Sequence, residues 1–107
     1  MQILIRHDNF STERYELQIQ ESALAFTGKG NSFIFPYSEL NDFNIMQDRR
    51  KKAYFTVLCS GRMVEGQILE PKEIDPFVAE LKEKMDGTIN IEVRKQFDSQ
   101  IMLRRYS

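Results

Sequence analysis

Four basic residues lie side by side near the middle of the chain, and this run has the plainest potential for binding chemistry. Asp48 is followed directly by Arg49, Arg50, Lys51 and Lys52. Adjacent Arg and Lys side chains can bind phosphate groups through charge-assisted hydrogen bonds, and they are attracted to anionic membranes. More often, however, such a run is the solvated tip of a hairpin. The residue types alone leave both interpretations of residues 49–52 open.

The rest of the composition does not reinforce a binding role for these cations. The chain has 15 Lys and Arg residues against 16 Asp and Glu residues, so its formal net charge is −1 at pH 7. No global field therefore attracts nucleic acid or an anionic membrane, and any such binding must come from a local patch. A length of 107 residues, with 41% hydrophobic and 29% charged residues, is typical of one globular domain.

His7 and Cys59 are the only histidine and the only cysteine. A metal site built on several histidines is thereby excluded, and so is a Ser-His-Asp arrangement that needs a second histidine. A Cys59–His7 dyad is formally open, but Cys59 lies in the most apolar segment, which favours a buried structural thiol. A lone cysteine also forbids an intramolecular disulfide and suits a reducing compartment. We expect no metal, no cofactor and no enzymatic activity.

Two other patterns resemble functional motifs and fail as such. Carboxylate pairs occur at Glu13 with Glu16 and at Glu80 with Glu83. We expect both pairs to face water, without the apolar surroundings that would raise a pKa for acid–base catalysis. The stretch GKGN, residues 28–31, is too short for a phosphate-binding loop and lacks Ser or Thr after the lysine. It indicates a turn, with glycines that supply positive φ angles.

Apolar and polar residues alternate with period two through most of the first 70 residues, which predicts strands. The segments that carry this alternation are QILIRH, RYELQIQ, ALAFT, SFIFP, DFNIMQ, AYFTVLC and RMVEGQIL. All but one of the connections between them are short, so we expect seven antiparallel strands in a meander. Gly66, inside the last segment, indicates a bulge or a sharp bend.

The period changes after residue 73, and this change predicts one amphipathic helix at about residues 75–86. One helical face collects the apolar residues Ile74, Phe77, Val78, Leu81 and Met85. Asp75 is a suitable N-cap, and Pro76 suits the first helical position because its missing N–H would have no partner there. Gly87 is placed to end the helix.

Beyond the helix, the segment TINIEVR alternates Ile89, Ile91 and Val93, which predicts an eighth strand at residues 88–94. This segment is either an added edge strand or an arm that reaches a neighbouring molecule. The tail at residues 95–107 has no clear period. Its apolar residues, which include Phe97, Ile101 and Leu103, would be exposed outside the core, and exposed apolar clusters often mark a partner surface.

The order of these elements over residues 2–86 resembles the pleckstrin-homology-like superfold, in particular its small bacterial and GRAM-type members. The phrases SFIFPYSELNDFNI and ILEPKEIDPFVAELKEKM are similar to the strand–turn–strand and last strand–helix segments of those domains. The resemblance implies a PH-like domain at residues 1–94: a mainly β fold with one helix, in which a seven-stranded antiparallel bent sheet or partly open barrel is capped by the C-terminal amphipathic helix.

The resemblance does not fix a function, because this superfold hosts lipid binders, peptide binders and assembly modules. In its phosphoinositide-binding members, basic residues gather on the first two strands and the loop that joins them. Here that loop, DNFSTE, is acidic. The run at residues 49–52 would instead join the fifth and sixth strands.

Our leading hypothesis is a non-enzymatic intracellular module that binds another protein or itself, through the predicted strand at residues 88–94 or through the tail. The alternative is weak, salt-dependent attachment to an anionic membrane or nucleic acid through residues 49–52. We infer no small-molecule substrate. We expect a cytoplasmic protein, because no apolar stretch resembles a signal peptide or the ~20 residues that cross a bilayer.

Overall fold

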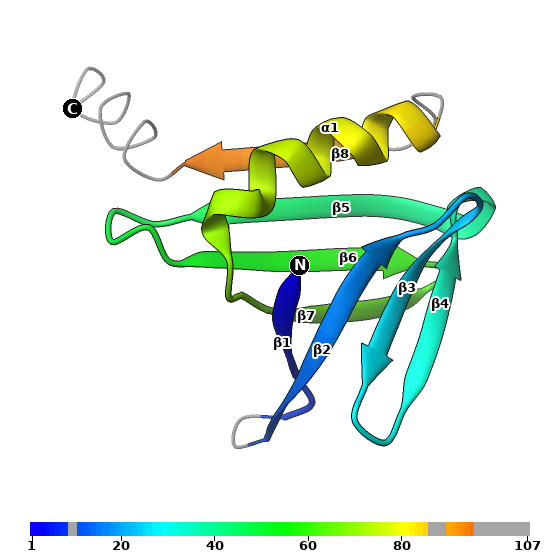
Figure 1. Ribbon diagram of the computed structural model, residues 1–107, viewed down its shortest axis with the longest axis horizontal. Helices are drawn as coiled ribbons and strands as arrows, with labels where there is room; N and C mark the ends of the chain where they lie inside the picture. Colours follow the sequence, from blue (N-terminus) through cyan, green and yellow to red (C-terminus); the bar gives the residue numbers. More distant parts are fainter. Residues whose placement is uncertain (9–10, 86–89, 96–107) are drawn as a thin grey trace.

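The computed structural model describes residues 1–8, 11–85 and 90–95, which form one sheet and one α-helix (Figure 1). The eight strands are β1 Gln2–Arg6, β2 Thr12–Ile19, β3 Ala23–Gly28, β4 Ser32–Pro36, β5 Leu40–Gln47, β6 Ala53–Cys59, β7 Arg62–Ile68 and β8 Asn90–Lys95. The α-helix, α1, spans Ile74–Lys84. Short 3-10 turns, η1 Tyr37–Glu39 and η2 Pro71–Glu73, precede β5 and α1. The mainly β prediction with one helix is confirmed.

The sheet has the strand order β4-β3-β2-β1-β7-β6-β5-β8. The first seven strands pair antiparallel, as predicted, but they do not form one continuous meander, because β4 and β5 are not neighbours and β7 pairs with β1. In addition, β8 pairs parallel with β5. The complete sheet is therefore mixed and eight-stranded, and the prediction of a wholly antiparallel seven-stranded sheet is wrong in this respect. Because β4 and β8 lie at opposite ends of the order, the sheet stays open and does not close into a barrel.

The sheet bends sharply between β1 and β7. In Figure 1, β1 to β4 run steeply across the view, whereas β5 to β8 run nearly horizontally. Gly66 lies at this junction, paired with Ile5 on one side and with Phe55 on the other. A Cβ atom on Gly66 would lie 1.8 Å from the carbonyl oxygen of Leu4. The glycine is required by the close approach of two backbones, and it marks a bend without a bulge in the register.

The core lies on the inner face of the bent sheet, against the apolar face of α1. Its largest fully buried side chains include Tyr15, Phe26 and Phe43. The helix contributes Ile74, Phe77, Val78 and Leu81, followed by Met85. The ring of Phe77 packs against the ring of Phe43 on β5, with their centroids 6.1 Å apart. The predicted apolar stripe of the helix is thus ordinary core.

The start of the helix differs from the prediction. The α-helix begins at Ile74 and continues directly from η2, so Asp75 and Pro76 lie within its first turn and Asp75 is not the N-cap. Glu73 occupies the N-cap position and makes no capping hydrogen bond with its side chain. A 3-10 turn that runs into a helix satisfies the first N–H groups through the backbone and needs no capping side chain. Gly87 lies outside the described residues.

The turn at residues 28–31 also differs from the prediction. Positive φ angles occur, among the described residues, at Lys51, Ser60 and Gly61, and none lies in this turn. Gly28 instead ends β3, where a Cβ atom would lie 2.7 Å from the ring of Tyr15. No helix in the described part of the chain is long and apolar enough to cross a membrane.

Candidate functional site

The basic run forms the loop between β5 and β6, and Asp48 organises its backbone. The Oδ1 atom of Asp48 accepts hydrogen bonds from the backbone N–H groups of Arg50 and Lys52, both at 2.9 Å. The backbone N–H of Lys51 donates to the carbonyl oxygen of Asp48 at 3.0 Å. The acidic residue at the start of the loop therefore fixes the course of the chain through backbone contacts.

The four basic side chains themselves have no partner among the residues that the structure describes. Arg49, Arg50, Lys51 and Lys52 are exposed, and none of their side chains forms an ion pair or hydrogen bond with a described residue. Lys51 adopts φ of 65°, a left-handed conformation that glycine or asparagine usually takes. We call these four residues the basic tip. Their charges remain available to solvent or to a partner.

The parallel pairing of β8 adds further basic residues at the same end of the sheet. Arg94 stands opposite Met46, and Lys95 stands opposite Gln47, the last residue of β5 before the loop. Because β8 runs in the same direction as β5, the C-terminal ends of both strands meet beside the basic tip. No sequence pattern indicated this neighbourhood, since the two strands are far apart in the chain.

Two exposed side chains with apolar surface lie directly behind the basic tip. Met46 and Tyr54 are a cross-strand pair on β5 and β6, with exposed fractions of 48% and 39%. They border a shallow depression of about 420 Å³ on the outer face of the sheet, whose rim also carries Arg6, Glu65, Glu92 and Arg94. Arg94 Nη2 lies 3.4 Å from Glu92 Oε1. This end of the sheet thus combines cations, one aromatic ring and a thioether.

The predicted partner-binding residues fall into two groups. Ile91 and Val93 of β8 are half-buried and pack against the hydrophobic core. Ile89, Phe97, Ile101 and Leu103 lie outside the described residues. The edge-strand interpretation of the segment after the helix therefore agrees with the structure at residues 90–95.

A separate polar cluster occupies the β1–β2 hairpin. One carboxylate oxygen of Glu13, Oε2, lies 3.0 Å from His7 Nε2 and also accepts a hydrogen bond from the Tyr15 hydroxyl at 3.0 Å. Asn31 Nδ2 donates to the same hydroxyl at 3.5 Å. The hydrogen bonds from His7 and Tyr15 lower the pKa of Glu13, whereas burial, followed by the Glu13 contact, raises the pKa of Tyr15.

Cys59 and His7 do not form the dyad that the sequence left open. Cys59 is buried at the β6–β7 turn, opposite Arg62, whereas His7 contacts Glu13 beyond the end of β1. Burial, reinforced by the negative charge of Glu39, raises the pKa of the Cys59 thiol. A thiol in this state is a poor nucleophile at neutral pH. The described residues also contain no group of three or more potential metal ligands.

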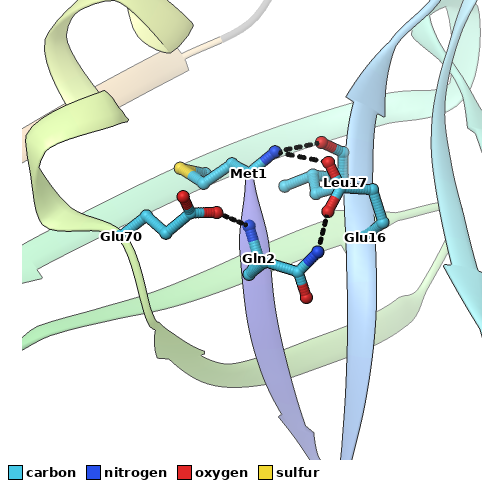
Figure 2. A network of polar contacts seen from close by, with 5 residues as sticks. All are labelled: Met1, Gln2, Glu16, Leu17 and Glu70. Carbon is cyan, nitrogen blue, oxygen red and sulfur yellow. Dashed lines mark hydrogen bonds and ion pairs between the residues drawn. The ribbon is translucent and has the colours of Figure 1, made fainter.

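A network at the start of β1 ties three parts of the fold together (Figure 2). The Met1 ammonium group donates to Glu16 Oε1 at 3.0 Å and to the carbonyl oxygen of Leu17 at 3.1 Å. The backbone N–H of Gln2 donates to Glu70 Oε1 at 2.7 Å, and the Gln2 side-chain amide donates to Glu16. These contacts join β1 to β2 and to the segment before α1, so their role is structural.

No known protein family has a model that matches this chain, and no curated protein matches it.

Proposed function

We propose that this chain is a non-enzymatic binding and assembly module of the pleckstrin-homology-like type, which pairs with a second copy of itself through β8. Seven antiparallel strands, in which the β1–β4 and β5–β7 meanders join through the β1–β7 pair, precede one amphipathic helix, and this layout supports the PH-like assignment. The burial and raised pKa of the Cys59 thiol favour a binding role over nucleophilic catalysis. A free thiol also suits the cytoplasm, where we place the protein.

The position of β8 at the edge of the sheet carries the proposal. β8 pairs with β5 on one side, and it is the last strand in the order. The backbone groups along the other side of an edge strand can pair with a strand from another chain. The opposite edge is less suitable, because β4 is a five-residue strand that ends in Pro36, which has no N–H to donate.

The charges on β8 favour a second copy as the partner. Two β8 strands that meet antiparallel around a two-fold axis at Val93 would place Glu92 of each copy opposite Arg94 of the other. This symmetric register forms two opposite-charge pairs on one face, and such cross-strand pairs stabilise a sheet. Within one chain, the Arg94–Glu92 pair is exposed and 3.4 Å long, so exchanging it for the intermolecular pairs costs little.

Charge reversal on β8 tests this register. We expect the full chain to dimerise with rising concentration in light scattering, and Glu92→Arg or Arg94→Glu alone to raise the dissociation constant about tenfold or more, because each places like charges in opposition twice. The double variant, with both substitutions, restores complementarity and should dimerise like the original. Glu65→Arg, an equal charge change on β7, is the matched control.

Failure of the double variant to restore dimerisation, or a monomer at every concentration, would contradict self-pairing through β8. A chain that ends at Lys95 separates the contribution of the tail. If this shorter chain still dimerises, the strand is sufficient; if it does not, the apolar tail residues contribute to the interface.

A further inference from the structure

We infer that the basic tip, together with Met46 and Tyr54 behind it, is a docking surface for an anionic lipid membrane. This inference does not depend on pairing through β8. It rests on three observations: the free cations, the organised backbone that presents them, and the apolar side chains beside them.

No described residue forms an ion pair with the basic tip, so its positive charges are available to another molecule. In the described part of the chain, the four side chains of the basic tip make no ion pair, although other exposed charges such as Lys84 do. Asp48 could have neutralised one of them, but its carboxylate binds backbone N–H groups. The loop keeps lysine at a left-handed position where glycine would be easier to accommodate. The result is four adjacent positive charges on a fixed turn.

The shape of the region suits a broad surface. The β5–β6 loop projects beyond the sheet at the left of Figure 1, so its tip can meet a flat partner first. Clusters of four to eight basic residues are typical of segments that bind anionic lipids. On the side of β8, Lys95 occupies the register position opposite Gln47 at the base of the loop, whereas Arg94 is already paired with Glu92.

The side chains of Met46 and Tyr54 suit the interfacial layer of a bilayer, just beneath the lipid phosphates. They form a cross-strand pair one position behind the loop, and both are substantially exposed. Tyrosine is favoured at membrane interfaces, because its ring is apolar and its hydroxyl remains hydrated. A tip that binds headgroups would bring this pair to the boundary between headgroups and acyl chains.

A nucleic acid fits the same region less well. A single strand lying across the sheet would follow the depression, where Glu65 and Glu92 offset the charges of Arg6 and Arg94 and leave no positively charged path for its phosphates. Proteins that bind single strands also stack several bases on aromatic rings. Tyr54 is the one aromatic residue among the exposed large hydrophobic residues of the described chain. Charge and shape together therefore favour a membrane.

Vesicle co-sedimentation tests the inference with the full chain. We expect binding to phosphatidylcholine vesicles that contain phosphatidylserine, little binding to vesicles of phosphatidylcholine alone, and weaker binding as salt screens the charges. Each basic residue contributes about fivefold to partitioning, so Lys51→Gln with Lys52→Gln should weaken binding about 25-fold. The control pair Lys72→Gln with Lys82→Gln removes two other exposed lysines, away from the basic tip, and should change binding less than about twofold.

A fluorescent variant locates the contact independently. The chain contains no tryptophan, so Tyr54→Trp places a single indole in the proposed surface. Its emission should shift to the blue on addition of anionic vesicles and be quenched by brominated lipid. Circular dichroism confirms that each variant remains folded.

Three results would overturn the inference: no binding to anionic vesicles, equal weakening by both lysine pairs, or an indole emission in the Tyr54→Trp variant that vesicles leave unchanged. Binding of single-stranded RNA without binding of vesicles would also overturn it and assign the cations to nucleic acid.

Discussion

The β1–β2 and β5–β6 hairpins belong to one sheet but use their charged residues in opposite ways. In the β1–β2 hairpin, Glu13 contacts both His7 and Tyr15, so its charge is used within the fold. In the β5–β6 hairpin, Asp48 binds the backbone, and the neighbouring cations have no ion-pair partner among the described residues. The comparison separates charges that hold the protein together from charges that are left for a partner. Substitutions at the β1–β7 junction and within each hairpin can test whether the two sets of charged residues differ in this way.

The largest effect is expected at Gly66, where β7 joins the two hairpins. Gly66→Ala should lower the free energy of unfolding by about 4 kcal/mol or more, because the new Cβ atom would collide with the backbone of Leu4. Denaturant unfolding measures this loss. Gly30→Ala is the control: nothing lies within 4 Å of its Cβ position, and its effect should stay within about 1 kcal/mol. A stable Gly66→Ala variant would contradict the observed β1–β7 register.

A smaller effect is expected from Asp48 within the β5–β6 hairpin. Asp48→Ala removes the acceptor for the N–H groups of Arg50 and Lys52 and should cost about 1–2 kcal/mol in the free energy of unfolding. Asp48→Asn keeps an acceptor oxygen and should recover most of this loss in the same measurement. If Asn is as harmful as Ala, the carboxylate acts through its charge on the basic tip and not through the backbone.

The smallest effect is expected from Glu13 within the β1–β2 hairpin, and it depends on pH. Hydrogen bonds lower the pKa of Glu13 below its ordinary value of 4.5 in the folded state. Its stabilisation is therefore present above the unfolded pKa and is lost as the pH falls through the lowered folded pKa. Glu13→Gln should flatten the acid decline of the thermal midpoint. Glu83→Gln, an equal charge change at an exposed position on α1, is the control, and identical profiles for all three proteins would argue against a role for Glu13.

Much of the fold could be predicted because its signals are local. The alternation in RYELQIQ and the helical spacing from Ile74 to Met85 reflect which side each residue turns to the core, and this depends on near neighbours. The start of the helix was missed because the preceding 3-10 turn made a capping side chain unnecessary. Asp75 and Pro76 lie two residues further into the helix than predicted, at its second and third positions, where they are also compatible with a first turn.

The candidate sites depend on contacts that no local pattern encodes. The run at residues 49–52 was visible as charge, but its proximity to Arg94 follows from the parallel pairing of β8 with β5. The sequence indicated a bulge or a bend at Gly66. The glycine is required, however, because the backbone of Leu4, which is far away in the sequence, leaves no room for a Cβ atom. The contacts of Asp48 likewise depend on the conformation of the turn, which the residue types do not specify.

β8 pairs with β5 alone, and this single pairing affects the order in which the strands form. Asp42 pairs with Asn90, so the pairing of β8 with β5 closes a long loop, and the entropic cost of this closure falls once β6, β7 and α1 have folded between them. No other described strand depends on β8 for its pairing. We therefore expect β8 to dock last and to detach first, with backbone amides that exchange with solvent sooner than those of β6. The proposed pairing edge is then the part of the sheet that forms latest and opens most readily, whereas the basic tip on the β5–β6 hairpin does not depend on it.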